Sequence, residues 1–323
     1  MEIGEIVKDF LRKHPETPSR TIARWINSRY PKIEIEDVRS LIRYYRGKSG
    51  AEHRLKLDTQ EFINQNYDLP LPSEYDSSDF RISENGVWIL SDIQFPFHDT
   101  RAVISTLDWG RNRRDKHDDL KAILLNGDIL DCYQLSTFSR DPRERNIQNE
   151  IDDCHDFIEV LKDEFQVPIY WKFGNHEERF ERYLYQNANE LAWLRKMNLE
   201  KYLELEKFQA KIIKDKRIIK IGHLHVIHGH EFRGGMISPV NPARTLFLRA
   251  KEPTLAGDKH MTSEHSGRTI GGKLITCWSI GCLCQLKPKY MPINEWNHGF
   301  AFVNNNGEMF RVLNLRIENG IVY

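Results

Sequence analysis

Residues 121–131 read KAILLNGDILD, an apolar run of strand length followed at once by a glycine and two aspartates. Four consecutive apolar side chains, Ala122 to Leu125, indicate a strand that is buried on both faces. The stretches 86–92 (GVWILSD) and 167–177 (VPIYWKFGNHE) repeat this pattern of an apolar run that ends in a polar turn. The sequence therefore predicts three buried strands, each with polar side chains at its carboxyl end.

Helical segments separate these predicted strands. Residues 100–110 are predicted to be helical, and residues 144–165 carry apolar side chains at helical intervals. Strands that alternate with helices predict a layered α/β core over residues 81–323. Within it, we expect a hairpin around residues 218–227 and a β-rich tail over residues 272–323.

Charge is distributed unevenly along the 323 residues. The whole chain balances 47 Lys and Arg against 47 Asp and Glu, so its formal net charge is zero. Residues 1–56 nevertheless hold 13 basic and 8 acidic side chains, whereas the remaining 267 residues hold 34 and 39. A basic N-terminal module joined to an acidic body keeps a nucleic-acid partner open, although the zero total alone would argue against one.

Residues 1–50 predict a small, basic, all-α domain of three short helices. Ser19 is the candidate N-cap of the second helix. On the third helix, Arg39, Arg43 and Arg46 fall on one flank at 100° per residue. This arrangement predicts a helix-turn-helix-like domain whose third helix binds DNA through these arginines. A helical dimerisation or packing domain is the alternative.

Residues 51–80 are expected to form a linker, because Pro, Ser and Asp replace apolar periodicity there. The chain has no apolar run of about 18 residues and no apolar signal core near its start, so we expect no membrane span and no secretory leader. Five cysteines, three of them in the apolar segment 277–284, favour buried thiols in a reducing compartment. These features together predict a cytoplasmic protein.

Five clusters of oxygen and imidazole groups follow predicted strands. They are Asp92-Ile93-Gln94, Gly127 to Asp131, Gly174 to Glu177, His228-Gly229-His230 and Gly257 to His260. In open α/β sheets, ligands bind outside the carboxyl ends of strands, so these clusters can converge on one site. Carboxylates, amides and imidazoles are together ligands of divalent metals. The sequence therefore predicts a metal site built from strand ends.

In this order and spacing, the clusters resemble the motifs of the calcineurin-like metallophosphoesterase family. The family pattern is D-x-H, GDxxD, GNHE, a strand ending in His, and GHxH, and this chain reads DIQ, GDILD, GNHE, VIHGHE and GDKH. The resemblance covers roughly residues 85–305 and is nearest in character to phosphoesterases carried by bacteriophages and prophages. It implies a four-layer αββα sandwich, metal-dependent hydrolysis of phosphoric esters and, for a phage-encoded protein, the cytoplasm of a bacterial host.

The resemblance also implies a role for each matching residue. Asp128 would bridge two divalent metals, and a hydroxide that they activate would attack phosphorus. His176 would be the general acid or would orient the phosphate, and Arg179 would pair with a phosphate oxygen. The remaining metal ligands would be Asp92, Gln94 and His260 for the first ion, and Asn175, His228 and Asp258 for the second.

Two of these positions depart from the family pattern. Gln94 and Asp258 stand where the family usually has histidines, so oxygen ligands replace two nitrogen ligands. Three carboxylates, two amides and two imidazoles favour Mn²⁺ or Mg²⁺ over Zn²⁺, with Ni²⁺ a further option. We expect an active site with two divalent ions, Mn²⁺ foremost. A degenerate site that binds metal poorly is the alternative.

Some neighbouring side chains are expected to support the site without forming it. Asp131 is expected to orient a ligand from outside the metal coordination. For His230 and Glu231 the same role and a purely structural hydrogen bond are equal alternatives. Cys282 and Cys284 alternate in an apolar run, which favours buried thiols over a metal or redox pair.

Three functions are consistent with the sequence. The first is a divalent-metal phosphodiesterase or nuclease that the basic N-terminal domain delivers to DNA. The second is a phosphomonoesterase that acts on protein or small-molecule phosphates. The third is a DNA-binding protein with a degenerate phosphoesterase domain. The loops 133–146 and 231–241, where substrate selectivity would reside, do not choose among them, and the sequence does not set the oligomeric state.

Overall fold

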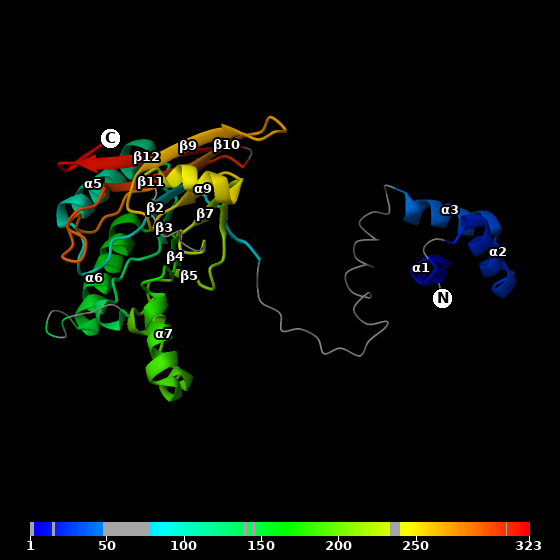
Figure 1. The fold of residues 1–323 in the computed structure, drawn as a ribbon, viewed down its shortest axis with the longest axis horizontal. Coiled ribbons are helices and arrows are strands. Elements are labelled where there is room, and N and C mark those ends of the chain that lie inside the picture. Colours follow the sequence, from blue (N-terminus) through cyan, green and yellow to red (C-terminus); the bar gives the residue numbers. More distant parts are fainter. Residues whose placement is uncertain are drawn as a thin grey trace. The chain divides into compact units, whose positions relative to one another are not determined.

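The computed structural model describes residues 3–14, 17–47, 78–137, 141, 143, 146–232, 240–307 and 309–323. The chain divides into two compact units, Met1–Asp76 and Ser77–Tyr323 (Figure 1). Residues 51–77 of the predicted linker lie outside the described residues. Phe80, the last residue of the predicted linker, begins a strand. Within the described ranges, none of the helices combines the length and apolar character needed to cross a bilayer.

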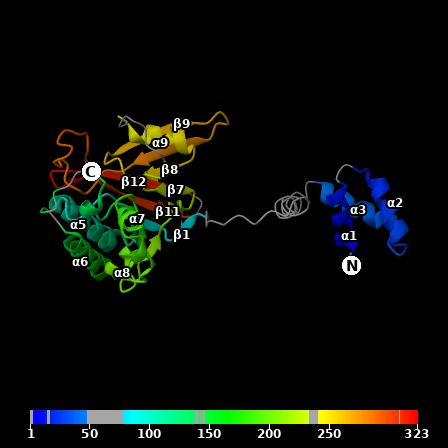
Figure 2. The same ribbon diagram turned by 60° about the horizontal axis from the view of Figure 1, so that its bottom comes forward.

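The N-terminal unit contains the three predicted helices, α1 (Ile3–Lys13), α2 (Ser19–Arg29) and α3 (Ile35–Arg46) (Figure 2). Each helix places apolar side chains three or four residues apart, so that one face of each is buried. These side chains form one small core of Ile6, Val7, Ile22, Ala23, Ile26, Val38 and Ile42. The expected small all-α N-terminal unit is therefore confirmed.

The start of α2 differs from the sequence-based expectation. Pro18 is the N-cap, and Ser19 is the first helical residue. The Ser19 hydroxyl accepts a hydrogen bond of 3.3 Å from the Arg46 guanidinium, which also donates to the Thr17 carbonyl at 2.7 Å. Contact with the end of α3 thus outweighs the local capping preference of serine.

The larger unit contains two sheets, one of which has seven strands in the order β13-β12-β11-β2-β3-β4-β5. Strands β2 to β5 pair in parallel, and β11, β12 and β13 extend the sheet in antiparallel fashion. The bounds are β2 (Gly86–Leu90), β3 (Ala122–Asn126), β4 (Ile169–Lys172), β5 (Lys211–Ile213), β11 (His298–Asn305), β12 (Phe310–Glu318) and β13 (Ile321–Val322).

A six-stranded sheet has the order β1-β6-β7-β8-β10-β9. The predicted hairpin is the antiparallel pair β6 and β7, and β8 pairs in parallel with both β7 and β10. The bounds are β1 (Phe80–Ile82), β6 (Ile219–Ile221), β7 (Leu224–Ile227), β8 (Thr254–Ala256), β9 (Ser263–Arg268) and β10 (Leu274–Ser279).

Two apolar layers result from the alternation of side chains along β2. Trp88 and Leu90 belong to the core under helices α5 (Thr100–His117) and α6 (Ile147–Phe165). Val87 and Ile89 point the other way and pack in the core between the two sheets. Helix α9 (Pro242–Ala250) covers the far face of the second sheet (Figure 1). The predicted four-layer αββα sandwich is confirmed.

The remaining helices follow the strands that carry the predicted site. The short η2 (Tyr133–Leu135) comes after β3, and α7 (Glu178–Asn187) comes after β4. Helices η3 (Asn189–Trp193) and α8 (Leu199–Tyr202) complete the connection from β4 to β5. The turns after β2, β3, β4, β7 and β8 are therefore fixed at strand ends, where the sandwich supports them.

Candidate metal centre

Polar side chains from five strand ends meet at one place in the structure. His228 Nε2, after β7, lies 3.3 Å from Asp128 Oδ2, after β3. The His176 N–H, after β4, donates to Asp128 Oδ1 at 2.9 Å. Asp92 Oδ2, after β2, accepts from the Asp258 N–H, after β8, at 3.0 Å. Because parallel strands end at a common edge, residues up to 168 positions apart, Asp92 and His260, become neighbours.

Five of the seven predicted metal ligands have left-handed backbone conformations. The φ angles are 56° at Asp92, 55° at Gln94, 53° at Asp128, 61° at Asp258 and 56° at His260. A residue other than glycine in this region costs on the order of 1–3 kcal/mol and persists only where its surroundings impose it. Such residues gather at functional sites, so this clustering marks the turns after β2, β3 and β8 as a site independently of any motif.

Two buried acceptors in the site have no hydrogen-bond partner among the described residues: Asn175 Oδ1 and His228 Nε2. His228 Nδ1 lies 2.8 Å from the Asn126 carbonyl, so Nδ1 carries the proton and Nε2 presents its lone pair. That lone pair faces the carboxylates of Asp128 and, at 3.9 Å, Asp258. A divalent cation would satisfy the lone pair and the carboxylates together and could accept the Asn175 oxygen as a ligand, so the residues present fit a divalent cation.

The pKa values of this cluster point the same way. Burial opposes protonation of His228, but Asp128, Asp92 and Asp258 outweigh it and raise the pKa of His228 well above its ordinary value. Burial likewise opposes ionisation of Asp128, yet His176 and His228 keep its pKa far below the usual range. The centre therefore demands positive charge around ionised carboxylates, as a metal site does.

Asp92 and His260 form the side of the site predicted to hold the first metal. His260 Nε2 lies 3.1 Å from Asp92 Oδ1, and the Trp296 ring packs against the His260 ring with centroids 4.1 Å apart. Gln94 is 5% exposed, and its backbone N–H donates to the Asp128 carbonyl at 3.0 Å. Asp92, Asp128 and His228 offer ligand atoms that all lie within 4.8 Å of one another.

Asp258 lies where its carboxylate can serve the second metal. Its Oδ1 is 3.9 Å from His228 Nε2, and its Oδ2 is 2.7 Å from the half-exposed Lys259 ammonium group. The structure thus brings the side chains of Asp92, Asp128, His228, Asp258 and His260 to one site, and it places the turns that carry Gln94 and Asn175 beside them. Their coordination of metal stays a prediction.

His176 is held in one orientation by two carboxylates. Its Nδ1 lies 3.0 Å from Asp131 Oδ1, and its Nε2 lies 3.5 Å from Asp128 Oδ2. Burial opposes protonation, but Asp128 and Asp131 raise the pKa of His176 above its ordinary value. Asp131 lies beside His176, where it can accept from Nδ1 and orient the ring.

Arg179 is engaged inside the protein. Its Nη1 donates to the Asp131 carbonyl at 2.7 Å, and its Nη2 lies 2.8 Å from His176 Nε2. Its side chain is 12% exposed. The sequence predicts that this guanidinium pairs with a phosphate, and the structure adds that it already fixes the loop carrying Asp131 and the ring of His176.

Glu177 is the residue to which the sequence-based reasoning gave no role. Its carboxylate accepts four backbone hydrogen bonds, from the N–H groups of Ile129, Leu130, Asp128 and Gly174 at 2.7, 3.1, 3.0 and 2.8 Å. The turns after β3 and β4 are thereby tied together. The sequence held one signal of this role: a glutamate that directly follows Asn175-His176 and directly precedes the start of a helix.

A buried ion pair supports the turn after β7. Glu231 accepts from the N–H groups of His228 and Gly229 at 3.0 and 2.7 Å. Lys172, which is fully buried, places its ammonium group 2.9 Å from Glu231 Oε1. Lys172 lowers the pKa of Glu231 to about 2 against the opposing effect of burial. Glu231 therefore shapes the loop of a predicted ligand.

Another buried carboxyl group lies beneath the loop that carries Asp131. Glu150, in the first turn of α6, is fully buried, and both carboxyl oxygens lie 3.3 Å from the Tyr133 N–H. Burial, with a further contribution from Asp131, raises the pKa of Glu150 to about 8. The group is therefore largely protonated at neutral pH and fixes the loop as a neutral side chain.

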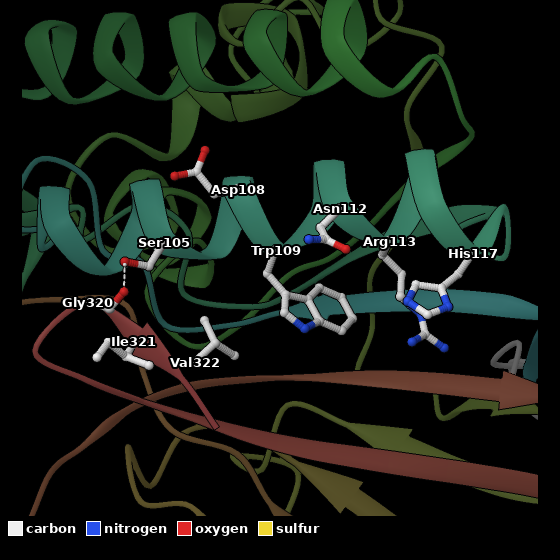
Figure 3. A pocket seen from close by; sticks show the side chains of 9 residues that line it. All are labelled: Ser105, Asp108, Trp109, Asn112, Arg113, His117, Gly320, Ile321 and Val322. Carbon is white, nitrogen blue, oxygen red and sulfur yellow. Dashed lines mark hydrogen bonds between the residues drawn. The ribbon is translucent and has the colours of Figure 1, made fainter.

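A surface hollow of about 470 Å³ lies away from these residues, between α5 and β13 (Figure 3). Trp109 and Val322 form part of its lining, and Ser105 donates a hydrogen bond to the Gly320 carbonyl at its edge. None of the predicted ligands lines it. The predicted selectivity loops fall partly at positions 138–140, 142, 144–145 and 233–239, outside the described residues.

Comparison with known proteins identifies relatives of the larger unit. Residues 86–278 match the family described as Calcineurin-like phosphoesterase. The Gene 54 protein of Mycobacterium phage L5 is 24% identical over 235 residues, which is 68% of this chain and 89% of that protein. The family match contains the strand ends that carry Asp92, Asp128 and Asn175.

Several solved structures are similar at low identity. A Vps29 single mutant from Entamoeba histolytica has a TM-score of 0.39 at 12% identity and covers 74% of this chain and 96% of its own. A dimetal phosphatase from Danio rerio has a TM-score of 0.32 at 11% identity, with 69% and 93% covered. The nuclease MPE of Pseudomonas putida has a TM-score of 0.30 at 9% identity, with 70% and 87% covered.

Replacing Glu177 tests the tie between the two turns. Glu177→Gln turns one acceptor into an NH₂ donor that faces backbone N–H groups, so we expect a loss of about 2–4 kcal/mol in the free energy of unfolding. Urea denaturation measures it. Glu178→Gln, at the neighbouring half-exposed position, is the matched control. Equal stability losses in the two variants would contradict the assigned role.

The pH dependence of stability tests the buried state of Glu150. Its folded pKa of about 8 exceeds the ordinary 4.5, so the stability it contributes is fully present below pH 4.5 and is lost as the pH rises toward 8. Between pH 5.5 and 8, the wild type should lose on the order of 3 kcal/mol relative to Glu150→Gln. Urea denaturation across this pH range measures the free energy of unfolding. Glu159→Gln, on the exposed side of α6, is the control. If the free energies of unfolding of the wild type and Glu150→Gln changed in parallel with pH, the assignment would be refuted.

Proposed function

The chain belongs to the calcineurin-like phosphoesterase family, which consists of metal-dependent phosphoric ester hydrolases, and from this premise we propose that it hydrolyses phosphodiester bonds in DNA. The observation that carries the proposal is the pair of buried, partnerless acceptors Asn175 Oδ1 and His228 Nε2, the second of them 3.3 Å from Asp128 Oδ2. They suit cations, and the N-terminal unit carries basic side chains on its third helix that suit a polyanion.

Two divalent cations would suit this set of side chains, and Asp128 would be a ligand of both. Asp92, Gln94 and His260 would hold one ion, and Asn175, His228 and Asp258 would hold the other. When bound, such a pair supplies an activated water and neutralises charge on phosphorus. Five of these seven ligands offer oxygen, which favours Mn²⁺ or Mg²⁺ over Zn²⁺. We propose Mn²⁺ as the preferred ion.

Side chains that are not metal ligands would transfer a proton to the leaving oxygen and stabilise the negative charge of the phosphate. His176 faces Asp128 with Nε2, at 3.5 Å, while Asp131, 3.0 Å from Nδ1, fixes the orientation of the ring. Nε2 accepts from Arg179 here, so it would take up the proton that it donates once Arg179 turns to the phosphate. We assign to His176 donation of this proton to the leaving oxygen, a task for which a histidine with a raised pKa is suited at neutral pH. Arg179, next to His176 Nε2, would stabilise the negative charge of the phosphate from the same side.

The N-terminal unit supports DNA as the substrate. Arg39 forms an ion pair with Glu36, and Arg43 lies 4.0 Å from the same carboxylate, so both are positioned on the exposed flank of α3. Arg46 is used to fix the start of α2. We propose that Arg39 and Arg43 contact the backbone of DNA, while Arg46 places α3 against α2 and contributes charge.

We place this reaction in the cytoplasm of a bacterial host. The support is the 24% identity to the Gene 54 protein of Mycobacterium phage L5. DNA is abundant there during phage growth, and the five cysteines, all unpaired and buried, are compatible with a reducing compartment.

Substrate preference and metal dependence test the proposed reaction. We expect hydrolysis of a nitrophenyl phosphodiester and of plasmid DNA with Mn²⁺, and slower hydrolysis of the nitrophenyl monoester. His176→Ala should lower kcat by about 10²- to 10⁴-fold because the proton donor is lost. Asn175→Ala should lower activity by weakening one metal site.

The exposed His223→Ala is the matched control for His176→Ala and should be fully active. Faster turnover of the monoester than of the diester would favour a phosphomonoesterase. Absence of hydrolysis with Mn²⁺, Mg²⁺, Ni²⁺ and Zn²⁺ alike would instead favour a DNA-binding protein whose Gln94 and Asp258 have made the site degenerate.

The DNA contact of α3 is tested in the full chain. Arg39→Ala combined with Arg43→Ala should weaken plasmid binding and reduce the slope of log affinity against log salt by about two, because two phosphate contacts are lost. Fluorescence anisotropy at several salt concentrations measures this. Turnover of the nitrophenyl diester should not change. Lys13→Ala on α1 is the control, and an unchanged salt slope in the double variant would rule out the contact.

A further inference from the structure

The segment that leaves the site after β4 exposes aromatic side chains. We call residues 178–196 the arm; it comprises α7, η3 and the following Leu194, Arg195 and Lys196. Phe180 and Leu184 anchor α7 in the core under the sandwich helices. Figure 1 shows α7 projecting away from the two sheets. The outer face of the arm therefore contacts none of the layers.

Aromatic exposure on the arm is unusually large. Trp193 is 86% exposed, more than any other described tryptophan, and Tyr185 is 63% exposed. Leu194 is 53% exposed beside them. Large aromatic side chains in water lose the favourable burial that they have in a core, so a group of them marks a surface that binds something.

The charges of the arm show what kind of partner suits this surface. The acidic side chains at the start of the arm form ion pairs with lysines outside it. Glu181, for example, lies 2.5 Å from the Lys214 ammonium group. Arg182, Arg195 and Lys196 are exposed and form no ion pair with another described residue. Glu190, also exposed on the arm, offsets one of these charges. Cations interleaved with aromatic rings suit a polyanion that carries flat bases.

The arm is continuous with the proposed catalytic site. Helix α7 begins two residues after His176, and Arg179 in its first turn contacts the His176 ring. Arg182 and Tyr185 follow Arg179 at successive three-residue steps, so the three side chains lie along one side of the helix. At 1.5 Å per residue, Arg179 and Tyr185 are separated by about 9 Å along the axis. A strand bound at the site would meet Arg182 and Tyr185 next.

We propose that the arm binds a single-stranded stretch of nucleic acid next to the cleaved bond, with bases stacked on Tyr185 and Trp193 and phosphates paired with Arg182, Arg195 and Lys196. This inference rests on the proposed function, because it names the form of the substrate. Exposed rings can stack only on bases that are free of their partners, and duplex DNA hides those faces. The arm therefore gives a preference for DNA that is unpaired near the cleaved bond, while duplex DNA binds without it.

The test compares single-stranded and duplex oligonucleotides of one sequence with the full-length protein. Trp193→Ala and Tyr185→Ala should each raise the KM for the single strand by about ten- to hundredfold, the loss expected for one stacked base. The KM for the duplex and the turnover of the nitrophenyl diester should stay within twofold of wild type. Arg182→Ala with Arg195→Ala should raise the single-strand KM and flatten its salt dependence.

Two matched controls isolate the arm. Tyr323→Ala removes a tyrosine of nearly equal exposure, 65%, at the far end of the chain, and Arg311→Ala removes an exposed arginine outside the arm. Single-strand KM values that are unchanged in Trp193→Ala and Tyr185→Ala would overturn the inference and leave the arm as a surface for a protein. Single-strand and duplex KM values that rise equally would also overturn it.

Binding without cleavage separates this inference from the proposed function. Fluorescence anisotropy of the labelled single strand should show a loss of affinity in Trp193→Ala even where no bond is hydrolysed. Wild-type binding through Trp193 without any cleavage would refute the proposed reaction and support the arm. Cleavage of the strand at a rate and KM independent of Trp193 would support the reaction and refute the arm.

Discussion

The carboxylate of Glu177 is the interaction on which the site depends. It is fully enclosed and accepts four backbone hydrogen bonds, two from the turn after β3, one from Asp128 itself and one from Gly174. Burial raises the pKa of Glu177, and the nearby Asp128 charge raises it further, but the converging N–H groups stabilise the ionised form. One side chain thereby holds two strand ends in the register that places Asp128 beside Asn175 and His176.

The rest of the site follows from that constraint and from charge. Asp92, Gln94, Asp128, Asp258 and His260 all have left-handed backbones, which each turn would avoid if it were isolated. The sandwich imposes these conformations, and Glu231 does for the turn after β7 what Glu177 does for the turns after β3 and β4. The carboxylates of Asp128 and Asp258 face the lone pair of His228 Nε2, and a cation between them would stabilise this arrangement. Strain and electrostatics together describe a centre built for cations.

Some features of the chain could be predicted from sequence and others could not. Apolar runs that end in Gly-Asp or Gly-Asn-His were sufficient for the strands, the αββα layers and the positions of the candidate ligands, because strand ends meet at a common edge. The role of Glu177, the engagement of Arg179 with His176, and the use of Arg46 to fix α2 were not predictable in this way. Helical and strand periodicity says which side chains share a face, but it does not say which distant atoms lie opposite.

The sequence by itself determined the two units, the layered core and the chemical types of the ligands, because each depends on local pattern: apolar spacing, charge segregation and residue identity at strand ends. Only the tertiary structure decided that Asn175 Oδ1 and His228 Nε2 are left without partners, that Glu150 is enclosed with its pKa near 8, and that Trp193 is 86% exposed on an arm leading from the site. These properties depend on what surrounds a side chain, and the surroundings come from residues far away along the chain.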